Sequence, residues 1–160
     1  MREFSKVSPK LWRSARFRGL QTDDGRLFYL YLLSCEHQTS AGCFRLPDAY
    51  AAADLGWPVD RLPAARNDAI DGGLIVHDDA TDEIHVLRWF RHNPPTNGKH
   101  LKGVQRLISE LDSDKVREAA ELDLTDQQSN VNPLDTPFEP ISHNGSRLTN
   151  SAYMAGRARL

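Results

Sequence analysis

Two turns that contain glycine divide the middle of this chain into short segments. Gly56 to Pro58 lies between stretches of helical pattern at residues 48–55 and 60–71, and Gly72-Gly73 follows the second stretch. Glycine closes a helix readily because it adopts the left-handed conformation at little cost. Pro63 is tolerated near the start of the second stretch because the first-turn N–H groups have no partner within the helix. The sequence therefore predicts two short helices joined by a tight turn. Asp60 is able to cap the second helix, and Ile70 is expected on its inner face.

Two β-favouring runs follow the second helix directly. Residues 74–77 and 84–89 are rich in Ile, Val and Leu and are separated by a polar turn, which predicts a β-hairpin. An isolated hairpin is only marginally stable in water, so we expect the short run at 42–46 to pair with it as a third strand. Helical patterns lie on both sides, at residues 23–37, where Thr22 is able to cap the helix, and at residues 99–111. The order is helix, strand, two helices, hairpin and helix.

This order predicts an α+β fold of the winged helix-turn-helix type, with a small antiparallel sheet and an additional C-terminal helix. Most aromatic residues precede residue 112, so we expect the core to end near Leu111. The later residues are polar and have no sustained period after Leu124, which is typical of a largely disordered tail. The predicted divisions are a basic arm at 1–21, the domain at 22–111, and a helical extension with the tail at 112–160.

The net charge of -2 hides three blocks of opposite sign. Residues 1–20 carry six bases and one acid, residues 45–83 carry three bases and nine acids, and residues 88–106 carry five bases and no acid. Clustered positive charge favours polyphosphate partners even when the whole chain is nearly neutral. The alternative is that each block is only a solvated face.

Several classes of protein do not fit the sequence. No apolar run approaches the length of a membrane helix, and no signal peptide is visible, so we expect a cytoplasmic protein without a membrane partner. Cys35 and Cys43 form no CxxC pair, so neither a disulfide framework nor a metal site is expected. Because nucleophile, zinc-protease and phosphate-loop motifs are absent, we expect neither an enzyme nor a cofactor.

Four segments carry a resemblance to a known family: Leu27 to Leu33, Gly42 to Pro47, Gly72 to Ile75, and Val86 to Asn93. On these segments, residues 8–111 resemble the small winged-helix domain at the N-terminus of phage replisome organisers and related DnaD-type replication-initiation proteins. The resemblance implies binding to double-stranded DNA at a replication origin, self-association, and contact with a replication or host protein that loads the helicase.

DNA contacts are expected from three places. In the second short helix, Arg61, Arg66 and Asn67 are able to reach base edges, because Arg pairs with guanine and Asn with adenine. The alternative for the two arginines is pairing with neighbouring acids. Phosphate contacts are expected from the basic arm and from the basic segment after the hairpin. These residues are Lys10, Arg13, Arg16, Arg18, Arg88, Arg91, Lys99 and Lys102.

The turn of the hairpin is acidic and is not expected to follow a phosphate backbone. Its acids are Asp78, Asp79, Asp82 and Glu83. They either keep the loop soluble or dock a basic protein partner, in which case the domain is a protein-interaction module on the same fold. A transcriptional regulator is a further alternative, because a fold does not fix a function.

The three tryptophans, Trp12, Trp57 and Trp89, are expected in the core, and their alternative role is stacking on the bases of a single strand. His77 and His85 lie on the two runs of the hairpin, but two histidines without a third ligand do not predict a metal site.

Overall fold

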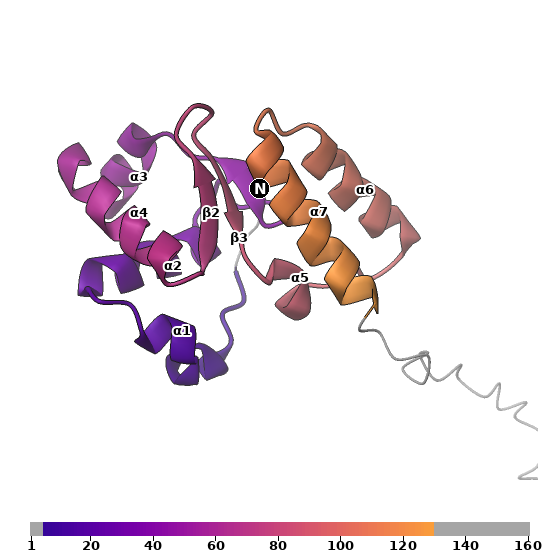
Figure 1. Ribbon diagram of the computed structural model, residues 1–160, viewed down its shortest axis with the longest axis horizontal. Coiled ribbons are helices and arrows are strands. Elements are labelled where there is room, and N and C mark those ends of the chain that lie inside the picture. Colours follow the sequence, from indigo (N-terminus) through magenta and orange to yellow (C-terminus); the bar gives the residue numbers. More distant parts are fainter. Residues whose placement is uncertain (1–4, 130–160) are drawn as a thin grey trace, which may run out of the picture.

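A computed structural model describes residues 5–129. Within that range the chain forms seven α-helices, two short 3-10 helices and a three-stranded antiparallel sheet, which confirms the α+β class (Figure 1). The helices are η1 (Pro9–Arg13), α1 (Ala15–Arg18), α2 (Asp23–Ser34), α3 (Asp48–Leu55), η2 (Val59–Arg61), α4 (Leu62–Asp71), α5 (Trp89–His92), α6 (Gly98–Ser109) and α7 (Asp114–Ser129). The strands are β1 (Cys43–Arg45), β2 (Ile75–Asp78) and β3 (Glu83–Val86).

Helix α2 begins where the sequence predicts a cap. The Thr22 hydroxyl accepts a hydrogen bond from the Gly25 N–H at 2.9 Å, and two acids lie in the first turn, where they interact favourably with the helix dipole. The helix ends at Ser34 rather than at residue 37, because Cys35 has an extended backbone. Its buried face packs against α4.

Helices α3 and α4 are the two short helices that the glycines predict. Gly56 closes α3 with φ of 64°, as expected for a left-handed cap. The turn η2 takes the place of an Asp60 cap, so α4 begins at Leu62. The inner face of α4 is largely as expected, but Ile70, predicted to face inwards, is exposed at the surface.

The expected third strand is present, and β3 is the centre of the sheet. The strand order is β1-β3-β2, and both pairings are antiparallel. His85 of β3 lies opposite Cys43 on one side and Val76 on the other, whereas His77 lies opposite Ile84. The two histidines of the hairpin therefore do not face each other.

The second run of the hairpin ends earlier than the sequence predicts, because Trp89 begins the short helix α5. Arg88 before it has φ of 62°, which turns the chain out of the strand. The Trp89 ring lies on Gly42, where a Cβ atom would come within 2.2 Å of the indole Cγ. The indole N–H also donates to the Ser40 carbonyl at 2.9 Å. These contacts fix the start of α5 to the sheet.

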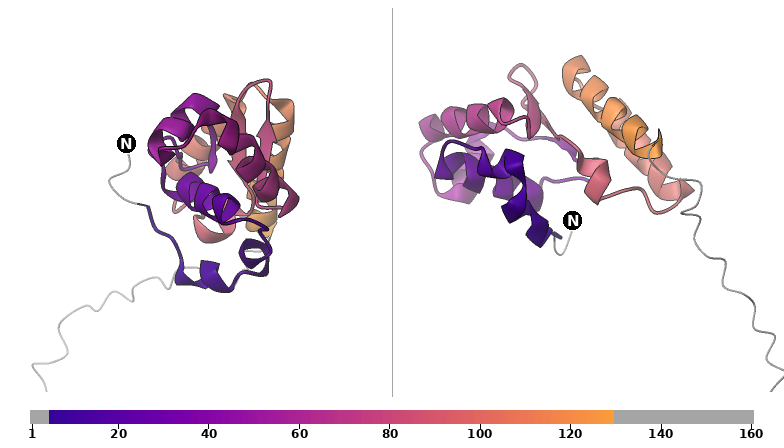
Figure 2. Two further views of the ribbon diagram at one scale, coloured as in Figure 1. Left: turned by 90° about the vertical axis from the view of Figure 1, so that its left-hand side faces the viewer. Right: turned by 60° about the horizontal axis from the view of Figure 1, so that its bottom comes forward.

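Helices α6 and α7 form an antiparallel pair beside the sheet, with α7 packed on β2, β3 and α5 (Figures 1 and 2). The expectation that the core ends near Leu111 is wrong, because Val116, Ala120 and Leu124 of α7 are buried in the same core. Residues 125–129, expected in the tail, complete α7. The rest of the expected tail, 130–160, lies outside the described residues. Between residues 5 and 129, no helix is long and apolar enough to cross a membrane.

Candidate nucleic-acid interface

The arginines between residues 19 and 87 are all paired with carboxylates. Arg26 contacts Asp23 at 2.8 Å, and Arg45 lies 4.0 Å from Asp82. The other two, Arg61 and Arg66, are residues that the sequence assigns to base recognition. The structure places their charged groups against acids rather than at the open face of α4.

Arg61 is held in two ways. Its Nε and Nη2 atoms donate to the Asp24 carboxylate at 2.6 and 2.5 Å, and its guanidinium lies 4.3 Å from the centre of the Trp57 ring. The hydrogen bond from Arg61 lowers the pKa of Asp24 and in turn raises the pKa of Arg61. The pair therefore stays charged, and the Asp24 carboxylate occupies the place at the guanidinium that a phosphate or base would take.

Arg66 is buried, with only 9% of its surface exposed. Its Nη1 donates to Asp48 of α3 and its Nη2 donates to Asp79 of the hairpin loop at 3.3 Å. Arg66 thus joins α4 to two neighbouring elements, and it does not reach the surface where a base would lie. Of the three expected base contacts, Arg61 and Asn67 are exposed and Arg66 is internal.

The four loop acids, expected either to keep the loop soluble or to dock a basic partner, differ in their surroundings. Glu83 is 5% exposed and accepts the Asp112 and Ser113 N–H groups at 3.0 and 2.7 Å. Asp78 accepts the Ser113 hydroxyl at 2.6 Å, and this hydrogen bond lowers the pKa of Asp78. Sequence reasoning missed these roles because their partners lie 30 and 35 residues further along the chain.

Asp79 and Asp82 remain near the tip of the loop. Asp79 is largely exposed, although it also contacts Arg66 and lies 3.4 Å from the buried His77 ring. Burial and the nearby Arg66 lower the pKa of His77, which keeps its ring neutral near pH 7. Asp79 and Asp82 thus also have partners within the fold, Arg66 and Arg45.

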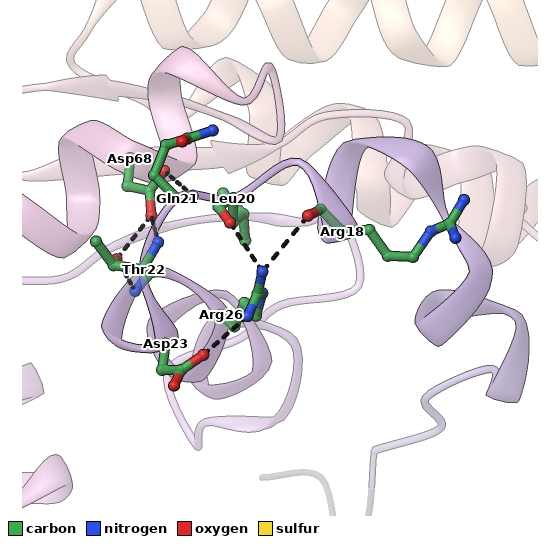
Figure 3. A network of polar contacts seen from close by, with 8 residues as sticks. Arg18, Leu20, Gln21, Thr22, Asp23, Arg26 and Asp68 are labelled. Atoms are coloured by element: carbon green, nitrogen blue, oxygen red, sulfur yellow. Dashed lines mark hydrogen bonds and ion pairs between the residues drawn. The ribbon is translucent and has the colours of Figure 1, made fainter.

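The C-terminal end of the basic arm is tied to the domain through its backbone (Figure 3). Asp68 of α4 accepts hydrogen bonds from the Gln21 and Thr22 N–H groups, both at 2.9 Å, and Arg26 donates to the Leu20 carbonyl at 3.0 Å. The Arg18 side chain points away from this network in Figure 3.

One expected phosphate contact of the arm has a structural role. Arg16 is half-buried, and its Nη1 donates to the Gly73 carbonyl at 2.9 Å. A cation at this position also interacts favourably with the C-terminal end of α4. Arg16 therefore fastens α1 to the turn after α4 and is less available to a ligand than its neighbours.

The remaining expected phosphate contacts are exposed and have no carboxylate within 4 Å in the described part of the chain. Together with Lys6 we call them the cationic edge: Lys6, Lys10, Arg13, Arg18, Arg88, Arg91, Lys99 and Lys102. On α6, Lys99 and Lys102 lie on the face opposite the buried Val104 and Ile108. Arg106, one turn after Lys102, pairs with Glu110 at 2.7 Å.

The elements that carry the cationic edge are neighbours in space. In Figure 1 the lower side of the molecule passes from η1 and α1, through α5, to the first residues of α6. The second view of Figure 2, in which this side comes forward, shows the same sequence of elements. The fold thus brings the two basic segments to one side, although 70 residues separate Arg18 from Arg88 in the chain.

A polar hollow of about 540 Å³ lies at this side between α5 and α7. Arg88 and Arg91 line it from one side, and Asp123, Asp126 and Gln127 line it from the other. Behind it the fully buried His85 ring has its Nε2 atom 3.3 Å from an Asp123 oxygen. The α7 acids were not expected near Arg88 and Arg91, because α7 was placed outside the domain.

Candidate metal and redox groups are sparse in residues 5–129, where no three His, Cys, Asp or Glu side chains cluster as metal ligands. Cys35 and Cys43 are free thiols, and burial raises the pKa of Cys43 to about 12. A thiol that stays protonated is a poor nucleophile and a poor ligand.

Comparison of the chain with models of protein families, with curated proteins and with solved structures gave no match.

Proposed function

We propose that this protein binds double-stranded DNA through the cationic edge, on a scaffold of the winged helix-turn-helix type. The order α2, β1, α3, α4, β2, β3 and the strand order β1-β3-β2 support the scaffold, with β2 and β3 as the wing. The proposed biological role of the protein is that of a phage or prophage replication-initiation factor. This role rests on the resemblance of residues 8–111 to replisome organisers.

The observation that carries the proposal is the separation of paired and unpaired cations. Arginines from residue 19 to 87 are neutralised by acids within the fold, whereas the eight cations of the cationic edge have no such partner in residues 5–129. Like charges gathered on one side repel one another, and an external polyanion removes that repulsion. A DNA duplex offers phosphates along such an edge.

The same contacts favour phosphate binding over base recognition. Helix α4 exposes Pro63, Ala64, Asn67, Ile70 and Asp71, while its arginine is internal. Few side chains of α4 are therefore able to read a major groove. We expect weak sequence preference and a steep dependence of affinity on salt. The acidic loop does not support the rival proposal of a protein-docking wing, because Glu83 is buried and Asp78 is hydrogen-bonded.

Fluorescence anisotropy with a labelled 20-base-pair duplex tests the proposal. The logarithm of the binding constant should fall linearly with the logarithm of salt concentration, with a slope no steeper than about -7 for eight phosphate contacts. Arg91→Ala with Lys102→Ala should make that slope shallower by about 2 and weaken binding for every duplex sequence.

A matched control is Arg45→Ala with Arg61→Ala, which removes two exposed but paired arginines. This variant should leave the slope unchanged, because both arginines already have a carboxylate partner. No binding of the duplex at low salt, or an equal loss in both double variants, contradicts the proposed interface. Circular dichroism of each variant checks that the fold is intact.

A further inference from the structure

We infer that Trp12 is a stacking platform for an unpaired base, so that the cationic edge also binds single-stranded DNA by a contact that duplex DNA cannot make. The inference rests on the proposed function, because the same cations would hold the phosphates of both ligands. It names a second class of ligand for that site and a residue that distinguishes the two.

Trp12 differs from the other two tryptophans in its exposure. It is 61% exposed, whereas Trp89 is 4% exposed and Trp57 is half-buried beneath the Arg61 guanidinium. Its burial in the core, expected from the sequence, is therefore not observed. A large indole ring in water forgoes the free energy that its burial would supply.

The indole ring is held in place rather than loose. Its ring centre lies 5.4 Å from that of Phe17, with an angle of 81° between the planes, and Phe17 is buried. This edge-to-face contact anchors one part of the indole on the core, and the large exposed area leaves ring surface for a ligand.

The backbone that carries Trp12 is also fixed. The Ser8 hydroxyl accepts the Lys10 N–H at 3.3 Å at the start of η1, and the Ser14 N–H donates to the Leu11 carbonyl at 2.9 Å at its end. A platform fixed in this way loses little conformational entropy when a ligand binds.

Charge at the same turn identifies the class of ligand. Lys10 and Arg13 flank Trp12 within η1, and both are exposed without an acidic partner in the described chain. Aromatic rings beside cations are the arrangement that binds single strands, because the bases stack while the phosphates meet the charges. The bases of a duplex are already stacked on each other, and a surface ring does not reach them.

The test compares labelled dT20 with a 20-base-pair duplex in the same anisotropy assay, using the full chain. Trp12→Ala should weaken dT20 binding about tenfold, about 1.4 kcal/mol and within the range for one stacked base, and change duplex binding less than about twofold. Trp12→Tyr should restore most of the dT20 affinity. Leu27→Ala, at an exposed apolar residue of α2, is the control and should change neither.

Intrinsic fluorescence gives an independent reading. Addition of dT20 should quench tryptophan emission, and Trp12→Phe should remove most of the quenching, since Trp89 is buried and Trp57 is half-buried beneath Arg61. Unchanged dT20 binding in Trp12→Ala, or an equal loss for dT20 and duplex, overturns the inference while the proposed function stands. Failure of the unaltered protein to bind either DNA overturns both.

Discussion

The central part of the chain, residues 19–87, and the basic segments on either side of it differ in what their charges contact. In the central part Arg26, Arg45, Arg61 and Arg66 have carboxylate partners, and several acids cap or join backbone elements. In the flanking segments the lysines and most arginines face solvent. The comparison teaches that the charge of a sequence block is a poor measure of the charge that a folded surface offers.

Charged side chains that pair inside the fold also fix the positions of the elements that they join. Exposed ion pairs stabilise proteins little, but a buried group with several partners fixes the elements it joins. Arg66 joins α3, α4 and the hairpin loop, and Glu83 joins the hairpin to the turn before α7. If these contacts hold the flanking segments to the centre, substitutions at them should lower stability.

The largest effect is expected at the point where the second basic segment leaves the sheet. Gly42→Ala should lower the free energy of unfolding by about 3 kcal/mol, because the new methyl overlaps the Trp89 ring at a residue with φ of 68°. Gly73→Ala is the matched control, since φ is 64° there but the space is open, and it should cost about 1 kcal/mol. Urea unfolding measures both, and similar losses would show that Trp89 does not fix the segment.

Removal of the buried carboxylate should have the next largest effect. Glu83→Ala leaves the Asp112 and Ser113 N–H groups without their acceptor, which should cost about 2 kcal/mol. Glu110→Ala, an exposed acid paired with Arg106, should cost less than about 0.5 kcal/mol. If urea unfolding shows the two variants to be equally stable, the loop acids are not internal in solution.

Ser113→Ala tests the same contact between the hairpin and α7 from the α7 side. The Ser113 hydroxyl accepts the Val116 N–H at 3.2 Å, so loss of this cap should cost about 1 kcal/mol at pH 7. The variant also removes the bond that depresses the pKa of Asp78. Stability that this group provides above pH 3.8 is lost as pH falls through its folded pKa, so the variant should lose less stability on acidification. An equal loss of unfolding free energy in the two proteins as pH falls would contradict this expectation.

The smallest effect concerns His77, the pKa of which is lowered by burial and by Arg66. The unfolded chain takes up this proton near the ordinary value of 6.5, whereas the folded chain takes it up only at lower pH. The contribution of His77 to stability should therefore be fully present above pH 6.5 and should decline as pH falls from 6.5 to the folded pKa. His77→Gln should flatten this decline in urea unfolding between pH 7.5 and 5, and His92→Gln, at an exposed position, should not.

The sequence was sufficient for features that depend on neighbouring residues. The Thr22 cap, the Gly56 closure and the hairpin follow from a few adjacent side chains, and the structure has all three. The spacing of Val116, Ala120 and Leu124 by four residues was a helical signal that the polar composition around it obscured.

Features that depend on distant residues could not be predicted in this way. Nothing near Glu83 in the sequence shows that a turn 30 residues later needs its carboxylate. Likewise, nothing near Trp12 shows that the Phe17 contact leaves its ring exposed, since apolar residues are normally predicted as core. Arg61 was expected either to contact bases or to pair with an acid near it in the sequence, but it pairs with Asp24, 37 residues away, because α2 packs on α4.

The junction between Glu83 and Ser113 also bears on the rate at which the protein unfolds. A contact between residues so far apart closes a long loop, and such contacts form late in folding because their entropic cost comes first. Interactions absent from the transition state slow unfolding more than they speed folding. If the contact between Glu83 and Ser113 forms after the transition state, Glu83→Ala should raise the unfolding rate more than it lowers the folding rate.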